Sequence, residues 1–202
     1  MKVLPFGDAA LLAEVDGLPE VLALAAAVRA ARPAGVLDVV PAARTVLLTV
    51  VPGTNLATLR RTVLELPVDP AAAPEGETVE IAVTYDGPDL ADVARLTGLD
   101  EDEVVAAHTG TPWRIAFGGF APGFAYLTGG DERLRVPRRD EPRTAVPVGA
   151  VGLAGEFSGV YPRSSPGGWQ LIGSTDAPLW DPDRDPPALL LPGGTVRFRV
   201  AP

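Results

Sequence analysis

The chain has 202 residues, 47% of them hydrophobic, so it can bury one good core or two small ones. Its formal net charge of −9 disfavours DNA, RNA and anionic membranes as partners, and no apolar run is long enough to span a bilayer. Cysteine is absent and His108 is the only histidine, which excludes disulfides, thiolate chemistry and metal sites built from nitrogen or sulfur ligands.

The first 65 or so residues predict six elements in the order ββαββα. They are, in chain order, residues 2–6, 9–15, 18–35, the two halves of 36–50, and 54–66. The first helix has Pro19 in its opening turn, and Thr54 or Asn55 is the expected N-cap of the second. We therefore expect a small α+β domain. Because the opening residues lack the layout of a signal peptide, we also expect a cytoplasmic protein.

Residues 67–78 form a linker-like stretch of Pro, Ala and Glu, so we place the domains at 1–77 and 78–202. The second domain opens with a predicted strand and two short helices, the later one with Asp100 and Glu103 at the spacing of a capping box. Short apolar segments then alternate with Gly and Pro. They are residues 113–117, 145–148, 149–154, 170–172, 189–191 and 196–200. This pattern predicts an antiparallel β-barrel or sandwich.

Three stretches of the second domain are candidates for a binding site. Residues 118–127, GGFAPGFAYL, combine glycine, proline and aromatic rings, as either a pocket wall or a tightly packed barrel corner does. Residues 158–176 hold all four serines and a Pro-Gly-Gly turn that can expose backbone N–H groups to a polar ligand, or else form a surface hairpin. Residues 136–143 carry three arginines, which either bind an anion or pair with Asp140 and Glu141 on a solvated loop.

His108 is the only side chain that titrates near neutrality without help, so it is either an acid–base group or a structural residue. Several common catalytic patterns are missing from the sequence. There is no phosphate-binding loop, no G-x-S-x-G elbow, and GAVGLAG does not match the dinucleotide fingerprint. Carboxylate coordination of Mg²⁺ is the one metal chemistry left open, although no acidic cluster indicates it.

Four motifs in order resemble a known family. They are HTGTPWRIAFGGFAPGFAYL, VPRRDEPRTAVPVGAVGLAG, GVYPRSSPGGWQLIG and LLLPGGTVRFRV. Together they resemble the PxpB/KipI family, the small subunit of bacterial ATP-dependent 5-oxoprolinase, also described as an allophanate hydrolase-like subunit. The resemblance runs from about Val79 to the C-terminus, and the opening LPFGDAALLAEV resembles the family's first domain. It implies an α+β class: a small N-terminal ββαββα domain followed by a cyclophilin-like antiparallel β-barrel, related to the carboxyltransferase part of urea amidolyase.

The resemblance also implies an activity and partners. The family assembles with a larger barrel subunit of the PxpC/KipA type and a LamB/YcsF-type PxpA subunit. The complex opens the lactam 5-oxo-L-proline to L-glutamate at the expense of ATP, with Mg²⁺, and we expect this chain to be inactive alone. Two alternatives remain: a KipI-like regulator that binds and inhibits a histidine kinase, and a non-catalytic structural half of a barrel heterodimer.

The resemblance and the residue patterns together give the expected site residues, with no metal ligand on this chain. The expected catalytic residues are His108 as acid–base group, Arg138 and Arg143 for anion binding, and Ser165 for the developing oxyanion; the expected substrate-binding residues are Phe120, Pro122, Gly123, Phe124, Tyr161, Gly167, Gly168, Trp169 and Gln170. The sequence also departs from the family pattern at four positions. Phe157 and Ser158 replace Gln-Thr, Ser174 replaces Arg, and Ala150 replaces Ser, which leaves open a different lactam or weakened catalysis.

Overall fold

The computed structural model describes residues 1–69 and 76–202, and the chain divides into two compact units, Met1–Pro74 and Glu75–Pro202. Each unit has its own sheet. The linker-like stretch expected at 67–78 falls in part on residues 70–75, which lie outside the described residues. The domain boundary expected at residues 77 and 78 therefore stays a prediction.

The N-terminal unit has the predicted ββαββα order. Its elements are β1 (Lys2–Pro5), β2 (Ala10–Glu14), α1 (Leu18–Ala31), β3 (Val36–Pro41), β4 (Thr45–Val50) and α2 (Leu56–Glu65). The strands form an antiparallel sheet in the order β1-β2-β4-β3. On β4, alternate residues are buried, as a strand with one face on a core requires. Of the two expected caps for α2, Asn55 is the one used, since its side chain accepts a 3.0 Å hydrogen bond from the Thr58 amide.

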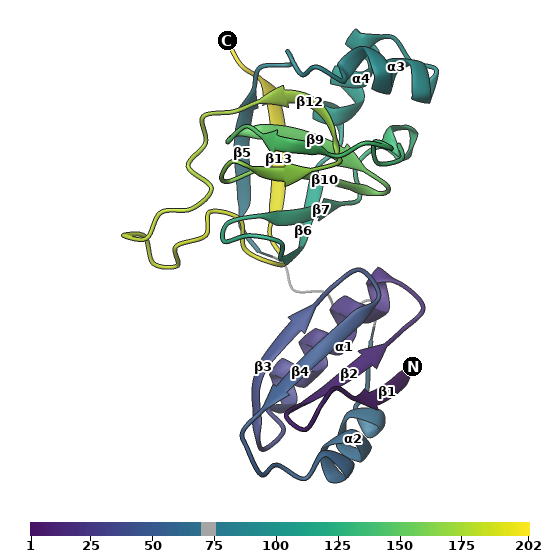
Figure 1. Cartoon of the computed structure of the whole chain (residues 1–202), viewed down its shortest axis with the longest axis vertical. Helices are drawn as coiled ribbons and strands as arrows, with labels where there is room; N and C mark the ends of the chain where they lie inside the picture. Colours follow the sequence, from purple (N-terminus) through teal and green to yellow (C-terminus); the bar gives the residue numbers. More distant parts are fainter. Residues whose placement is uncertain (70–75) are drawn as a thin grey trace. The chain divides into compact units, whose positions relative to one another are not determined.

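The C-terminal unit contains one long sheet wound into a nearly closed barrel (Figure 1). Its sheet strands are β5 (Thr78–Val83), β6 (Trp113–Gly118), β7 (Ala125–Thr128), β9 (Ala150–Ala154), β10 (Phe157–Val160), β12 (Gln170–Ser174) and β13 (Thr195–Val200). The strand order is β12-β9-β10-β7-β6-β13-β5, and an antiparallel bridge between Thr84 and Ser174 links the two ends. The predicted α+β class and barrel are confirmed.

Some pairings differ from the sequence-based expectation. β5 and β13 pair in parallel. The rest of the unit forms the long connection that a parallel pair of strands requires. Strands β7, β10 and the short β11 (Ser165–Gly167) were not predicted, and the strand expected at 189–191 does not form. Pro186, Pro187 and Pro192 flank that segment, and a proline has no N–H to give to a sheet.

Helices α3 (Leu90–Thr97) and α4 (Glu101–Gly110) pack beside the barrel, α3 against β12 and α4 against β13 (Figure 1). The predicted capping box is present at the start of α4: Asp100 accepts from the Glu103 amide at 2.7 Å, and Glu103 accepts from the Asp100 amide at 2.9 Å. A short 3-10 helix, η1 (Glu132–Leu134), precedes β8 (Arg143–Val146), which pairs only with β11 among the described strands. Within the described ranges, no helix is long and apolar enough to cross a membrane.

Candidate functional site

A buried carboxylate, Asp89, joins the segments that the sequence singled out. Its side chain is 2% exposed, and its Oδ1 accepts hydrogen bonds of 2.7 Å from both Arg139 Nη1 and Arg143 Nη2. Its Oδ2 accepts a 2.7 Å bond from the Leu171 amide. Burial raises the pKa of Asp89, but the hydrogen bonds and charges of Arg143, the Leu171 amide and Arg139 together outweigh burial and hold it below its usual range. Asp89 is therefore an ionised anchor for two guanidinium groups.

The chain places Asp89 there by running the segment before α3 directly against β12. The Gly87 amide donates to the Ile172 carbonyl at 3.3 Å, and the Asp89 amide donates to the Leu171 carbonyl at 3.0 Å. A Cβ at Gly87 would collide with backbone atoms of Ile172 and Leu171, so only glycine allows this approach. Asp89 is the N-cap residue of α3 but makes no capping bond with its side chain, because its carboxylate is committed to the arginines.

The arginine-rich segment and the Pro-Gly-Gly turn lie side by side. Strands β8 and β11 pair, with Arg143 opposite Gly167 and Ser165 opposite Val146. The Arg139 amide also donates to the Gly168 carbonyl at 2.8 Å. Two of the three segments expected to form a site are thus brought together, beside Asp89.

The third segment, residues 118–127, joins them through an aromatic cluster, defined as Phe120, Phe124, Tyr126, Tyr161 and Trp169. The Phe124 ring meets the rings of Trp169 and Tyr161 edge-on, each at a centroid distance of 5.5 Å. The Phe124 and Tyr126 rings of this loop therefore pack against Trp169 of the Pro-Gly-Gly-Trp hairpin, with Phe124 only 3% exposed.

Phe120 differs from the other rings of the aromatic cluster. It is 58% exposed and has a φ of 68°, which lies in the left-handed region that a side chain with a Cβ rarely adopts. Its neighbour Pro122 is also exposed, and Gly123 takes a φ of 82°. The loop thus holds a strained, exposed ring at its tip, a feature that concentrates at functional sites.

Tyr161 connects the aromatic cluster to the turn. It is 2% exposed, and a Cβ at Gly167 would lie 2.5 Å from the Tyr161 hydroxyl, so the turn sits directly on the ring. Burial raises the pKa of Tyr161, while the positive charge of Arg138 and the Trp169 backbone partly oppose it. The hydroxyl therefore stays protonated at neutral pH and can donate a hydrogen bond.

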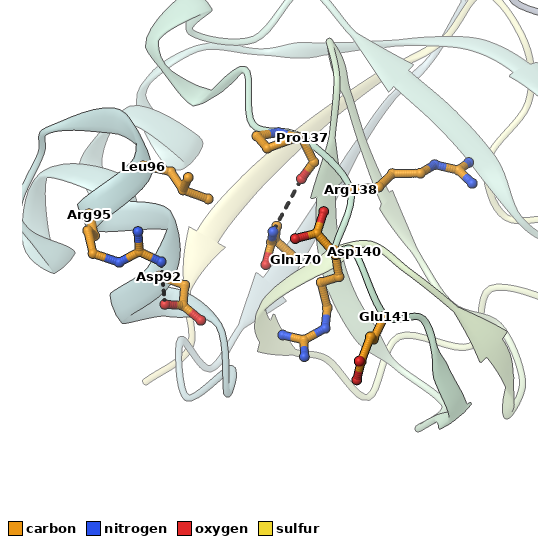
Figure 2. A pocket seen from close by; sticks show the side chains of 9 residues that line it. Asp92, Arg95, Leu96, Pro137, Arg138, Asp140, Glu141 and Gln170 are labelled. Carbon is orange, nitrogen blue, oxygen red and sulfur yellow. Dashed lines mark hydrogen bonds and ion pairs between the residues drawn. The ribbon is translucent and has the colours of Figure 1, made fainter.

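A cleft of about 500 Å³ opens between α3 and the arginine-rich segment (Figure 2). Its lining residues are Asp92, Arg95, Leu96, Pro137, Arg138, Arg139, Asp140, Glu141 and Gln170. Three are arginines and three are carboxylates, so their formal charges cancel. On the α3 wall, Arg95 Nη2 donates to Asp92 Oδ1 at 2.9 Å. On the floor, Gln170 Nε2 donates to the Pro137 carbonyl at 3.2 Å.

Four buried side-chain atoms in the described part of the chain lack a hydrogen-bond partner, and all belong to this region. They are Arg139 Nε, Arg143 Nη1, Ser165 Oγ and Gln170 Oε1. Native proteins leave few such atoms, because an unsatisfied buried polar group costs about 1–3 kcal/mol. Their concentration in one region makes it the candidate binding site of the described chain. We refer to Asp89, Arg139, Arg143, Ser165 and Gln170 as the polar cluster.

His108 lies elsewhere, in the barrel core. It is completely buried, with Nδ1 at 2.7 Å from the Tyr85 hydroxyl and Nε2 at 2.9 Å from Ser158 Oγ, and its ring stacks on Phe198 at 4.3 Å. Burial lowers the pKa of His108 to about 3, so the ring is neutral. Because both ring nitrogens are occupied inside the core, the geometry does not support the expected acid–base role. Ser158, a departure from the family pattern, serves as a partner of this histidine.

The two arginines expected to bind an anion, Arg138 and Arg143, lie in different surroundings, and their role stays a prediction. The structure places Arg139, rather than Arg138, beside Arg143 at Asp89. Arg138 is exposed, and Figure 2 shows its guanidinium directed away from Gln170. Arg139 and Arg143 pair with Asp89 rather than with the neighbouring Asp140 or Glu141. Of the two adjacent arginines, Arg139 is the one whose backbone amide bonds the Gly168 carbonyl. The sequence does not reveal this contact between distant residues.

The comparisons with known proteins agree with this fold and these motifs. The family described as carboxyltransferase domain, subdomain C and D, matches residues 1–190. The chain belongs to this family. A protein of Escherichia coli O157:H7, named as the B subunit of 5-oxoprolinase, is 52% identical over 131 residues, which cover 63% of this chain and 60% of that protein. The protein of the same name from Bacillus subtilis (strain 168) is 47% identical over 123 residues, covering 59% of this chain and 51% of that protein.

The resemblance to the PxpB family expected from the motifs is therefore confirmed. The chain matches between 51% and 60% of the length of these two relatives, whose names describe them as subunits. Among solved structures, the crystal structure of TTHA0988 has a TM-score of 0.79 and 38% identity. That match covers 96% of this chain and 40% of the other, so the fold of this chain recurs as part of a longer protein.

Proposed function

We propose that this chain is the B subunit of an ATP-dependent 5-oxoprolinase, whose complex cleaves 5-oxo-L-proline to L-glutamate. The observation that carries the proposal is the 52% and 47% identity to two proteins that are each named as the B subunit of 5-oxoprolinase. The identity alone does not say what the chain contributes. The polar cluster supplies that part of the proposal, because it brings unsatisfied hydrogen-bonding atoms from two motif-bearing segments to one place.

The chemistry to be served is the opening of an amide that water attacks only slowly. Negative charge develops on the lactam oxygen as the ring opens, and fixed donors aimed at that oxygen stabilise the transition state. Arg143 Nη1 and Ser165 Oγ are buried donors without a partner, on paired strands. Asp89 fixes the Arg143 guanidinium through its other amino group, so the donor is held in place before the substrate arrives. We assign Arg143 and Ser165, together with Arg139 Nε of the same polar cluster, to the lactam oxygen that becomes the oxyanion.

In this proposal ATP is bound by another part of the assembled complex. The sequence has no phosphate-binding loop, and its one lysine is Lys2. The charges lining the cleft cancel, and residues 1–69 and 76–202 contain no group of three His, Cys, Asp or Glu side chains that could hold a metal ion. We therefore assign Mg-ATP to the assembled complex, through the larger PxpC/KipA-type subunit or the PxpA subunit.

The acid–base group also belongs to a partner in this proposal, because His108 is neutral and occupied in the barrel core. This observation supports the expectation that the chain is inactive alone. Its part is to hold and polarise the lactam, while a residue of the larger barrel subunit moves the proton.

The test is ATP-dependent release of glutamate from 5-oxo-L-proline by the co-expressed subunits, with each subunit left out in turn. We expect turnover only with all subunits present. In the complete complex, Ser165→Ala should lower kcat about 10-fold or more, since the loss of one oxyanion donor costs that much or more. Ser164→Ala is the matched control, because Ser164 is the exposed neighbour on the same segment. Equal turnover by the two variants would remove Ser165 from the site, and no glutamate from the complete set would refute the function.

A further inference from the structure

Gln170 presents an unsatisfied hydrogen-bond acceptor at the cleft. The residue is 6% exposed, and its Nε2 donates to the Pro137 carbonyl, which fixes the orientation of the amide because a carbonyl can only accept. Its Oε1 is buried without a partner. In Figure 2 this oxygen faces α3, on the side of Asp92 and Arg95. A group that completes this site must donate a hydrogen.

The second unsatisfied atom among the cleft-lining residues is a donor, Arg139 Nε. The Arg139 guanidinium is held by Asp89 through Nη1, and its backbone amide is held by Gly168, so the side chain is fixed at both ends. The cleft therefore offers one immobilised donor and one immobilised acceptor. A cyclic amide carries the complementary pair on adjacent atoms of its ring, a carbonyl oxygen and an N–H in the cis arrangement.

The charges of the cleft disfavour a highly charged ligand. Three arginines and three carboxylates line it, a balance that would not compensate the charge of a triphosphate. Arg95 stands on the α3 wall and binds Asp92 through one nitrogen, Nη2, with its side chain 69% exposed. The rest of its guanidinium fork is positioned to meet a ligand carboxylate.

We propose that the cleft between α3 and residues 137–141 binds the lactam through its amide edge. Gln170 Oε1 accepts the ring N–H, Arg139 Nε donates to the ring carbonyl, and Arg95 meets the carboxylate. Both atoms are buried although their residues line the cleft, so a ligand reaches them only by displacing the side chains that cover them. The assignment rests on the proposed function, since it takes its ligand from there, and it adds the recognition site and the residues that select an amide.

The composition of the chain makes the first test direct. Gln170 is the only glutamine and Asn55 the only asparagine, so the ¹⁵N spectrum of the full chain contains two side-chain amide pairs. Asn55 caps α2 in the N-terminal unit and serves as the internal control. On titration with 5-oxo-L-proline we expect the Gln170 pair to shift and the Asn55 pair to stay. A spectrum in which neither pair moves, or both move alike, would overturn the assignment.

The second test separates recognition of the N–H from a structural role. The probes are 5-oxo-L-proline and its N-methyl derivative, which lacks the donor, and the proteins are the wild-type chain and Gln170→Met. Because a buried acceptor left unpaired is costly, the wild type should prefer 5-oxo-L-proline by about 10-fold. In Gln170→Met that preference should fall to within about twofold. If methionine weakens both ligands equally and leaves the preference unchanged, Gln170 does not read the N–H.

The two proposals fail in different ways. If the chain binds and selects the lactam but the complete set of subunits releases no glutamate, the cleft assignment stands and the enzyme assignment falls. If glutamate forms normally and Gln170→Met leaves the preference for the N–H intact, the enzyme assignment stands and the cleft assignment falls. The glutamate assay on the complete complex, run with both lactams as substrates, gives this second outcome as a ratio of kcat/KM values.

Discussion

Asp89→Asn is the sharpest perturbation of the polar cluster, because it removes one charge with almost no change of shape. In the wild type, one carboxylate satisfies two guanidinium groups and the Leu171 amide, each at 2.7 Å. An asparagine has one oxygen and one NH₂ group, so at least one of the three donors would face another donor. Removing one partner of a buried ion pair costs about 3–5 kcal/mol. The arginine side chains are 31% and 23% exposed and regain some hydration, so we expect about 3 kcal/mol.

Urea unfolding followed by tryptophan fluorescence measures the loss of unfolding free energy in the C-terminal unit. All three tryptophans, Trp113, Trp169 and Trp180, lie in the C-terminal unit, so the signal reports that unit alone. Asp92→Asn is the matched control on the same helix. Its pair with Arg95 is exposed, with side chains 48% and 69% accessible, and such pairs contribute about 0.5 kcal/mol or less. A loss under about 1 kcal/mol for Asp89→Asn, or equal losses for the two variants, would refute the reasoning.

The same comparison has a definite pH dependence. The folded-state pKa of Asp89 lies below its usual value, so its contribution to stability is complete above the unfolded-state pKa of about 3.9. That contribution is lost as the pH falls through the folded-state pKa, because protonation then removes the charge in both states. The difference in unfolding free energy between wild type and Asp89→Asn should therefore be full at pH 7 and shrink below about pH 4. A difference that stays constant down to pH 2 would show that Asp89 acts through shape rather than charge.

Three further predictions concern the core and the loop. His108 has a folded-state pKa of about 3, below its ordinary value, so protonation of the unfolded chain should reduce stability as the pH falls from about 6.5 toward 3. Urea titrations at several pH values give the unfolding free energy of wild type and His108→Gln as a function of pH. The two plots should differ in slope by up to about 1.4 kcal/mol per pH unit, and parallel plots would contradict a buried neutral ring. Gly159→Ala should destabilise by about 1–3 kcal/mol, since its Cβ would lie 2.9 Å from Phe124 Cζ, whereas Gly110→Ala, with open space at the Cβ, should cost nothing measurable in the same urea assay. Phe120→Gly relieves a positive φ, so the melting temperature of the chain alone should not fall while turnover of the complex drops; a lower melting temperature would instead mean that the ring is structural.

Local signals in the sequence predicted much of the fold. The Asn55 cap and the capping box at Asp100 and Glu103 each depend on residues within a few positions of one another. The short strands β7, β10 and β11 were missed because they have only three or four residues, too few for a periodic pattern.

The polar cluster could be predicted only in part, because its anchor is distant in sequence. Asp89 lies 50 residues from Arg139 and 54 from Arg143, and the close approach that brings it there depends on Gly87 meeting the backbone of β12. A single aspartate after Gly-Pro is typical of an ordinary helix start, so no local pattern predicts that Asp89 is buried. The sequence nevertheless singled out Arg143 and Ser165 through the family resemblance and Gln170 through the cluster of neutral polar residues, three of the four residues with unsatisfied atoms. It did not single out Arg139, because a motif shared by a whole segment does not show which of two adjacent arginines turns inward.

The features of the C-terminal unit that cost stability are concentrated where the family motifs meet. Arg32 also has a positive φ, but it is the C-cap of α1, where a left-handed residue is ordinary. Phe120 has no such explanation, and the unsatisfied atoms of Arg143, Ser165 and Gln170 have no partner among residues 1–69 and 76–202. Selection for stability alone would remove such features, since each costs on the order of 1–3 kcal/mol and single substitutions can relieve it. Their shared location is best explained by a ligand and a partner subunit that compensate these costs on assembly. Substitutions that stabilise the isolated chain at these positions should therefore impair the complex.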